Sequence, residues 1–155
     1  MSRGLTITEF IFVIVLFTFL SLVALPMYDL YVNSEHKKTA VSQMKDMIAP
    51  ALQRLYEDTG TFPPSKIGND PDLVNNEDKL AKWQGPYLKS WPRGPFGWTP
   101  DGAKGAYQFR NFYYKGYHTV VLWCYGLNQT PETDITSGTP ASGDDIVIYL
   151  LHTRM

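Results

Sequence analysis

An uninterrupted apolar run near the N-terminus constrains this chain more than any other feature. Residues 10–28 read FIFVIVLFTFLSLVALPMY without a charged side chain, and only Glu9 is ionisable between Leu5 and Asp29. At about 1.5 Å per residue, a helix of about 20 such residues crosses a hydrocarbon layer about 30 Å thick. Because the run is apolar on every side, we expect lipid or other helices to cover it.

Three explanations of this run differ in how they treat its flanks. A cleaved secretory signal has a shorter apolar core and a small-residue cleavage site, which residues 26–29, Pro-Met-Tyr-Asp, do not provide. A simple membrane anchor fits the length but gives no reason for Glu9, since a carboxylate inside an apolar span is costly and usually functional. The third explanation depends on the residues that precede the run.

The first ten residues, MSRGLTITEF, resemble the processing signal of type IV prepilins. That family has a short basic leader ending in Gly, then an apolar first mature residue, and a Glu at the fifth mature position. The resemblance implies that Arg3 belongs to the leader, that a peptidase cuts after Gly4, and that Leu5 becomes the N-methylated terminus. It also implies that Glu9 is the assembly carboxylate and that Pro26 is the helix-loosening proline.

The position of Glu9 gives the resemblance a physical basis. Glu9 lies four residues after Leu5, which is one helical turn, so both groups share a helix face. In a filament, the Glu9 carboxylate of one copy would neutralise the Leu5 amine of its neighbour, and the pair would set the register. Alternatively, Glu9 lies at the membrane boundary and reaches the headgroups. Arg3 before the run favours a cytoplasmic N-terminus in a bacterial inner membrane, with the remaining chain in the periplasm or beyond.

A second helical pattern follows the apolar run. Apolar residues recur at helical spacing, and Gly60 is a plausible stop after them; they are Val41, Met44, Ile48, Leu52 and Leu55. We therefore expect one long helix from about Leu5 to Asp58, with an apolar half over 5–28 and an amphipathic half over 29–60. Pro26 predicts a kink or local melting, and Pro50 predicts a bend.

Residues 61–155 predict a small globular head. Aromatic and β-branched stretches over 107–114 and 117–125 flank Lys115-Gly116 and predict a hairpin, and 146–152 predicts a third strand. Residues 69–78 are polar and predict a surface loop. Residues 83–98 hold so many prolines that their aromatic side chains must order them. The expected fold class is α+β: a long N-terminal helix, its apolar half protruding or transmembrane, packed on a small antiparallel sheet, as in pilins.

Two further segments narrow the resemblance to the major pseudopilin of type II secretion. They are ALQRLYEDTGTFPPS at 51–65 and WQGPYLKSWPRGPFG at 83–97, although Gly94 stands where that family usually has Asp. Members of the family end in a Gly/Asp-rich loop that binds calcium, and the comparable stretch here is 126–146. The resemblance implies calcium as a cofactor. Carboxylates for its oxygen-rich shell would come from Asp134, Asp144 and Asp145. Alternatively, Asp144 and Asp145 only solvate the start of a strand.

The resemblance also implies the function and the partners. The chain would be a structural subunit, not an enzyme, whose polymerisation drives protein export. Its partners would be copies of itself in a helical filament, the prepilin peptidase and N-methyltransferase, an inner-membrane platform with a cytoplasmic ATPase, minor pseudopilins, and membrane lipid. Residues 1–4 would be the leader. The alternatives are a surface type IV pilin for adhesion or motility, a membrane-anchored glycan-binding module that uses the aromatic residues over 109–125, and a minor pilin at a filament tip, against which Glu9 argues.

Composition excludes several other classes of function. A net charge of −1 over 155 residues leaves no basic surplus to neutralise phosphates, so we expect no nucleic-acid partner. The one cysteine, Cys124, excludes an intrachain disulfide and a multi-cysteine zinc site. Cys124 lies inside a predicted strand, where a packed thiol is the expected state. The three histidines show no HExxH spacing, which leaves a zinc hydrolase without support.

Overall fold

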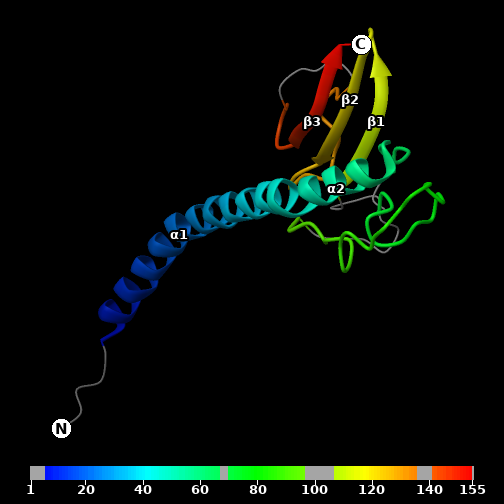
Figure 1. Cartoon of the computed structure of the whole chain (residues 1–155). Coiled ribbons are helices and arrows are strands. Elements are labelled where there is room, and N and C mark those ends of the chain that lie inside the picture. Colours follow the sequence, from blue (N-terminus) through cyan, green and yellow to red (C-terminus); the bar gives the residue numbers. More distant parts are fainter. Residues whose placement is uncertain (1–5, 67–69, 97–106, 136–140, 155) are drawn as a thin grey trace. The chain divides into compact units, whose positions relative to one another are not determined.

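The computed structural model describes residues 6–66, 70–96, 107–135 and 141–154, with the side chains of 152–154 excepted (Figure 1). The helical elements are α1 (Ile7–Ser42), the π-helix η1 (Gln43–Ile48) and α2 (Ala49–Thr59). The strands are β1 (Gln108–Tyr114), β2 (Tyr117–Cys124) and β3 (Ile146–Arg154), which form one antiparallel sheet in the order β1-β2-β3. One long apolar N-terminal helix followed by a small antiparallel sheet is an α+β arrangement, as the sequence predicts.

The chain divides into two compact units, Met1–Glu35 and His36–Met155. The first unit contains the apolar part of α1. The second unit contains the end of α1, the elements η1 and α2, and the sheet, and it holds the buried hydrophobic residues.

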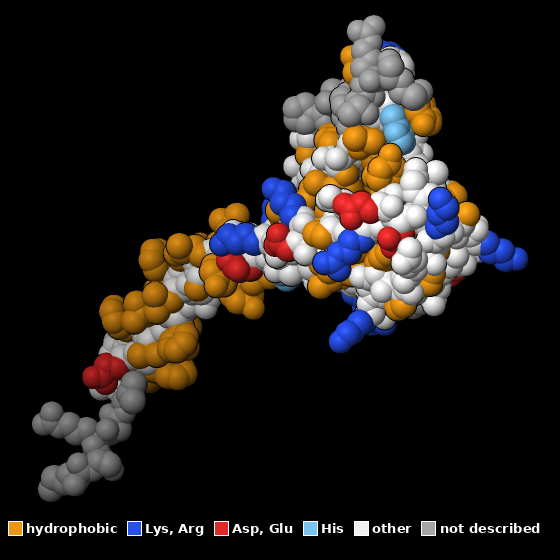
Figure 2. All heavy atoms as spheres, viewed as in Figure 1, with side chains coloured by type: hydrophobic (Ala, Val, Ile, Leu, Met, Phe, Trp, Pro, Cys, Tyr) orange, Lys and Arg blue, Asp and Glu red, His pale blue; other side chains and the backbone are white. Residues whose placement is uncertain are grey.

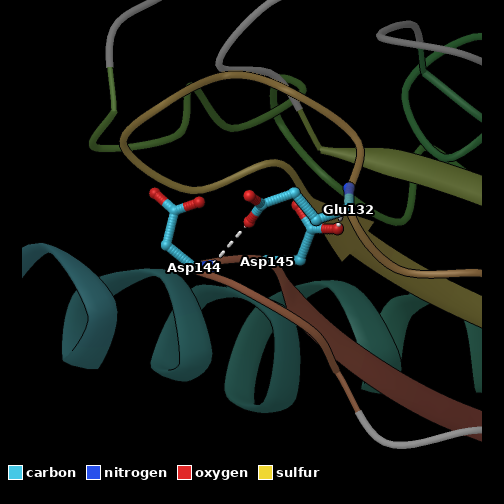
Figure 3. Close-up of side chains that lie close together, drawn as sticks. All are labelled: Glu132, Asp144 and Asp145. Atoms are coloured by element: carbon cyan, nitrogen blue, oxygen red, sulfur yellow. Dashed lines mark hydrogen bonds between the residues drawn. The ribbon is translucent and has the colours of Figure 1, made fainter.

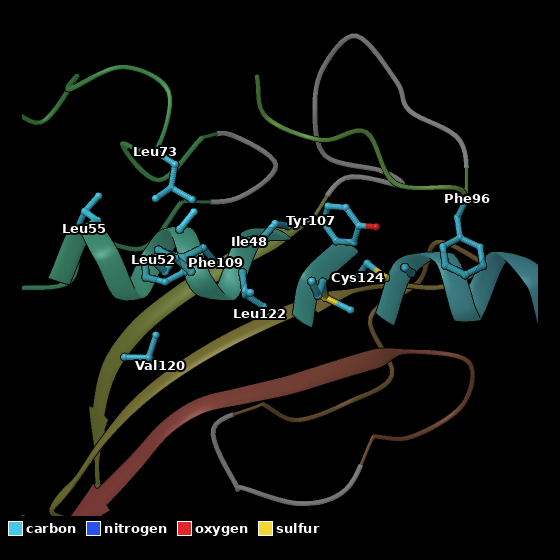
Figure 4. Close-up of a cluster of buried hydrophobic side chains, with 13 residues drawn as sticks. Ile48, Leu52, Leu55, Leu73, Phe96, Tyr107, Phe109, Val120, Leu122 and Cys124 are labelled. Atoms are coloured by element: carbon cyan, nitrogen blue, oxygen red, sulfur yellow. The ribbon is translucent and has the colours of Figure 1, made fainter. Parts of the chain in front are cut away.

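The main core of the second unit lies between the helices and one face of the sheet (Figure 4). Four of the five residues of the predicted stripe are fully buried, while Val41 is only half-buried and Ala40 is buried instead. Positions three and four residues before Met44 lie on the same helix face, so either can meet the sheet. The helices are packed against Phe109, Val120, Leu122 and Cys124.

Pro50 lies in the first turn of α2, directly after η1. A proline has no N–H to donate, and its ring crowds the carbonyl four residues earlier. In the turn before it, the Ala49 N–H donates to the carbonyl of Met44, five residues back, in the wider π-helical pattern. The structure therefore has a π-helix where we expected a bend, and this wider turn accommodates the proline.

Glycine residues end the last helix and close the first hairpin. Gly60 has φ of 75°, and its N–H donates to the Tyr56 carbonyl at 2.8 Å, so the predicted helix stop is confirmed. In the hairpin, Lys115 and Gly116 have φ of 48° and 81°, the left-handed pair of a two-residue turn. Tyr114 pairs with Tyr117 across this turn, as the sequence predicts.

The prediction of a surface loop over 69–78 is correct only in part for the residues that the structure describes: Glu77 and Asp78 are exposed, but Asp72 and Leu73 are fully buried. Asp70 accepts hydrogen bonds from the backbone N–H groups of three residues, those of Leu73, Val74 and Asn75. Asp72 Oδ1 accepts from the N–H groups of Glu77 and Asp78 at 2.8 and 3.1 Å and lies 3.6 Å from Lys66 Nζ. The polar side chains thus organise a folded loop from within.

Aromatic residues order the segment after this loop, as predicted. Trp83 Nε1 donates to the Asp72 carbonyl at 2.7 Å, and the Tyr87 hydroxyl donates to Asp58 Oδ2 at 2.8 Å. Trp91 packs against the main core, and Phe96 is buried within it. Residues 97–98 of the predicted segment lie outside the described residues.

Candidate functional site

Helix α1 begins with a reciprocal cap. The backbone N–H and the hydroxyl of Thr6 both donate to Glu9 Oε2 at 2.8 Å, and the Glu9 N–H lies 3.4 Å from Thr6 Oγ1. This is a capping box, in which the Thr at the helix start and the Glu three residues later satisfy each other's free groups. The sequence contains the pattern typical of this cap, Thr-x-x-Glu at 6–9, but we had interpreted Glu9 only through the resemblance to prepilins. Gly4 and Leu5 lie outside the described residues.

The apolar part of α1 forms a surface on which none of the described residues of other elements packs. Large hydrophobic side chains from Ile7 to Tyr31 are exposed, and Figure 2 shows hydrophobic side chains covering this stretch of α1. The hydroxyl groups of Thr18 and Ser21 bond to the helix itself: Thr18 Oγ1 donates to the Ile14 and Val15 carbonyls, and Ser21 Oγ donates to the Phe17 carbonyl. The helix is long and apolar enough to cross a membrane.

Pro26 lies inside α1, and the helix continues on both sides of it. We expected a kink or local melting at this position, and the structure excludes the melting. A proline inside a helix removes one backbone hydrogen bond, and the remaining turns hold the helix together.

An acidic corner forms where the segment after β2 meets the start of β3. The carboxylates of Glu132, Asp144 and Asp145 each place one oxygen within 4.8 Å of the others (Figure 3). We had expected Asp134 here, but it is not one of the three. Instead, Asp134 lies near Tyr149: burial of the Tyr149 hydroxyl raises its pKa, and the negative charge of Asp134 raises it further. Glu132 was missed because no sequence pattern connects it to Asp144.

The acidic corner is held in place by backbone donors. Asp144 Oδ2 accepts from the N–H groups of Leu127 and Asn128, and Asp145 Oδ2 accepts from those of Glu132 and Thr133 at 2.8 and 2.6 Å. Glu132 Oε2 in turn accepts from the Asp144 N–H at 3.0 Å. Each of the two Asp side chains therefore uses one oxygen to join the loop to β3.

The second oxygens of the two Asp side chains lack a hydrogen-bond donor among the described residues. Asp144 Oδ1 and Asp145 Oδ1 are buried and accept no hydrogen bond in the described part of the chain. Water has little access to Asp145, because the whole residue is only 6% exposed. A buried carboxylate oxygen without a partner is costly, and a hard cation that prefers oxygen ligands would satisfy it. The residues present therefore suit calcium, with Glu132 supplying the third carboxylate.

Two glycines shape this corner. Gly126 and Gly143 have φ of 70° and 62°. A side chain at Gly143 would collide with the Glu132 carboxylate, and one at Gly126 would collide with the Asp144 backbone. The close approach of these segments thus depends on glycine at both positions.

The remaining candidate groups do not form a reactive centre among the described residues. Cys124 is fully buried, as predicted, and burial raises the pKa of its thiol to about 11, which disfavours the nucleophilic thiolate. His118 Nε2 lies 2.7 Å from Asn111 Oδ1, and the His118 ring stacks on the Tyr113 ring. The His36 ring makes an edge-to-face contact with the Phe96 ring.

The aromatic run over 109–125 serves partly as core. Phe109 and Trp123 are buried, as expected of core residues, whereas Tyr113 is 63% exposed. Comparison with known proteins found no match to this chain among family models, curated proteins or solved structures.

Proposed function

We propose that this chain is the structural subunit of a type IV pilus-like filament, of the kind formed by the major pseudopilin of type II secretion. The proposal rests chiefly on the position of Glu9, whose carboxylate lies at the start of a helix with exposed apolar side chains. The chain also has a long N-terminal helix and a small antiparallel sheet, an α+β arrangement consistent with a pilin-like subunit. The chain would then act by assembling and would carry out no chemical reaction.

The exposed apolar side chains of the helix must be shielded from water, and two environments would shield them. Before assembly, membrane lipid would surround the residues from Ile7 to Tyr31, with the N-terminus in the cytoplasm and the head in the periplasm. After assembly, the same surface would pack against the helices of other copies, where van der Waals contact replaces contact with lipid. Because neither state leaves the apolar side chains in water, transfer between them is energetically plausible.

Glu9 explains why assembly would be ordered rather than a simple aggregation of apolar helices. Both hydrogen bonds from Thr6 reach the same carboxylate oxygen, Oε2, and Oε1 accepts none in the described part of the chain. Cleavage after Gly4 would expose a cationic amine at Leu5, and Oε1 of a neighbouring copy is a suitable acceptor. A charge pair in apolar surroundings is favourable only when both partners are present, so it would select one register.

The same proposal implies the partners. A membrane peptidase and N-methyltransferase would process Gly4 and Leu5, and an inner-membrane platform with a cytoplasmic ATPase would drive polymerisation. Minor pseudopilins would begin or cap the filament. Calcium, held by Asp144, Asp145 and Glu132, would stabilise the head by joining the loop after β2 to β3.

Processing and assembly are tested on the full chain expressed in a bacterium with a type II secretion system. Mass spectrometry of the membrane-derived protein is expected to show loss of residues 1–4 and a methylated Leu5. Electron microscopy of material sheared from the cells is expected to show filaments that contain this chain. An uncut chain, or one that never polymerises when expressed with the assembly machinery, contradicts the proposal.

A further inference from the structure

The two outer edges of the sheet differ in how the chain covers them. The edge of β1 is closed, because Lys66 and Phe109 exchange two backbone hydrogen bonds of 3.0 Å. Beside them, the Asn111 N–H donates to Ser65 Oγ at 3.0 Å. Along the outer edge of β3, no other backbone segment pairs among the residues that the structure describes.

The open edge has the composition of a docking surface. Residues 146–151 read IVIYLL, carry no charge, and are all only partly buried. Sheet edges that remain in water usually carry a lysine, a proline or a bulge that discourages pairing with another chain. In the described pairing with β2, β3 has one bulge, because Val120 pairs with Leu151 and Val121 with Tyr149, which leaves Leu150 as the extra residue. The outer side of these six residues still lacks a charged or proline residue that would protect it.

A hollow of about 380 Å³ adjoins this edge, between α2 and β3. Leu150 and Leu151 form its wall on the strand side, and Pro50, Gln53 and Tyr56 form part of its wall on the helix side. Tyr56 is 44% exposed, although its ring stacks on Phe62 with centroids 4.6 Å apart. The hollow thus presents immobilised apolar surface to solvent, which is the usual character of a docking pocket.

Lys45 connects this hollow to a basic one. It lines the apolar hollow and also a second hollow of about 420 Å³, whose charged lining is Lys37, Lys38 and Lys45 against the single carboxylate of Asp46. The two hollows and the β3 edge form one continuous surface, which we name the β3–α2 surface. It is apolar at one end and basic at the other, so a partner must offer apolar side chains together with carboxylates.

We propose that the β3–α2 surface receives a second copy of this chain, so that neighbouring heads in the filament make contact there; the inference rests on the proposed function. The chain itself offers the complementary chemistry on a different surface. Its loop over 70–78 carries the carboxylates of Asp70, Glu77 and Asp78; Lys66 forms ion pairs with Glu77 and Asp78, and the Glu77 side chain is 63% exposed. A contact between two different surfaces of identical copies leaves both surfaces free at the ends of the assembly, so it builds a filament when its rotation does not close into a ring.

The contact is tested by cysteine labelling of the full chain, in assembled filaments and after dispersal in detergent. Gln53→Cys places a thiol at the apolar hollow, and Arg54→Cys places one on the next, also exposed, residue of α2, which does not line the hollow. Maleimide labelling of Gln53→Cys is expected to slow by about tenfold on assembly, because docking buries the thiol, while labelling of Arg54→Cys keeps its rate.

The possible outcomes separate this inference from the proposed function. Filaments in which Gln53→Cys keeps its labelling rate, or in which both thiols slow equally, overturn the β3–α2 contact and leave the filament proposal intact. Absence of filaments from the wild-type chain overturns both. Charge reversal gives a second measurement: Lys45→Glu is expected to reduce filament yield, while Lys45→Arg retains it. Equal yields from Lys45→Glu and the wild type contradict a role for the basic end.

Discussion

A single carboxylate oxygen of Glu9 accepts two hydrogen bonds from Thr6, one from its backbone N–H and one from its hydroxyl, both at 2.8 Å. Glu9 therefore caps its own helix before any second copy is present. The cap also explains how a carboxylate persists beside a long apolar segment, since two donors of the same chain already solvate it. Assembly then needs only the other oxygen of Glu9, so the cap and a contact between copies can exist together.

Removing the Glu9 carboxylate is expected to stop assembly without unfolding the head. Glu9→Ala removes both the cap and the acceptor for a neighbouring amine, so filament yield by electron microscopy should fall to background. Near-UV circular dichroism of the head should be unchanged, because the core lies in the second unit. Thr6→Ala is the matched control: it loses the hydroxyl of the cap, at a cost of about 1 kcal/mol, but keeps the charge. A Glu9→Ala chain that polymerises normally contradicts the charge-pairing role.

Calcium is expected to raise the melting temperature of the protein. With a dissociation constant in the range of extracellular calcium sites, about 10 mM calcium should raise it by roughly 3–10 °C relative to chelator. Asp145→Asn should abolish the rise, because it removes charge from the most buried carboxylate of the acidic corner. Asp134→Asn should retain it, since Asp134 lies outside the corner. Identical melting curves with calcium and with chelator rule the site out.

The hairpin turn makes stability sensitive to Gly116. This residue has φ of 81°, and a Cβ there would meet no atom within 4 Å, so the cost of a side chain is conformational only. Gly116→Ala should lower the free energy of unfolding by about 1 kcal/mol, or the melting temperature by about 2–4 °C. Lys115→Asn should stabilise slightly, because Asn tolerates the left-handed backbone of that position. Equal melting of Gly116→Ala and the wild type would show that the turn adopts another conformation.

Cys124 should make stability depend on pH in the alkaline range. Burial raises its pKa from 9.0 to about 11, so the folded chain holds the thiol proton more tightly than the unfolded chain does. The stability from the protonated thiol is complete below about pH 9 and is lost as the pH rises toward 11, by up to about 1.4 kcal/mol per pH unit. Urea unfolding should therefore show a steeper fall over this range for wild type than for Cys124→Val. Parallel curves would contradict the buried thiol.

Patterns with a fixed period predicted most of the fold. The apolar residues Met44, Ile48, Leu52 and Leu55 recur at helical spacing and are all buried, and the predicted strands agree with the observed ones to within three residues. Periodicity reports only on which side of an element faces the core. It therefore could not place the π-helix before Pro50, which is a local response of the backbone to a missing donor.

Tertiary hydrogen bonds account for what the sequence could not predict. Asp72 belongs to a polar stretch, and its burial depends on N–H groups of its own loop and on the more distant Lys66. Glu132 joins Asp144 because Gly143 leaves room for its carboxylate. Neither relationship has a period or a motif in the chain. Glu9 was found by family resemblance, and its cap with Thr6 was available in the sequence as Thr-x-x-Glu.

The π-helix has a consequence for how the length of this chain can vary. A π-helical turn holds one residue more than an α-helical turn, and the segments on either side of it keep their own phase. Deletion of one exposed residue within 43–48 would therefore keep Ala40 and Leu52 facing the sheet, but the α-helical turn that results would place the Pro50 ring against the carbonyl four residues earlier. The extra residue of the π-helix thus lets a proline lie inside a helix without turning the buried face toward water.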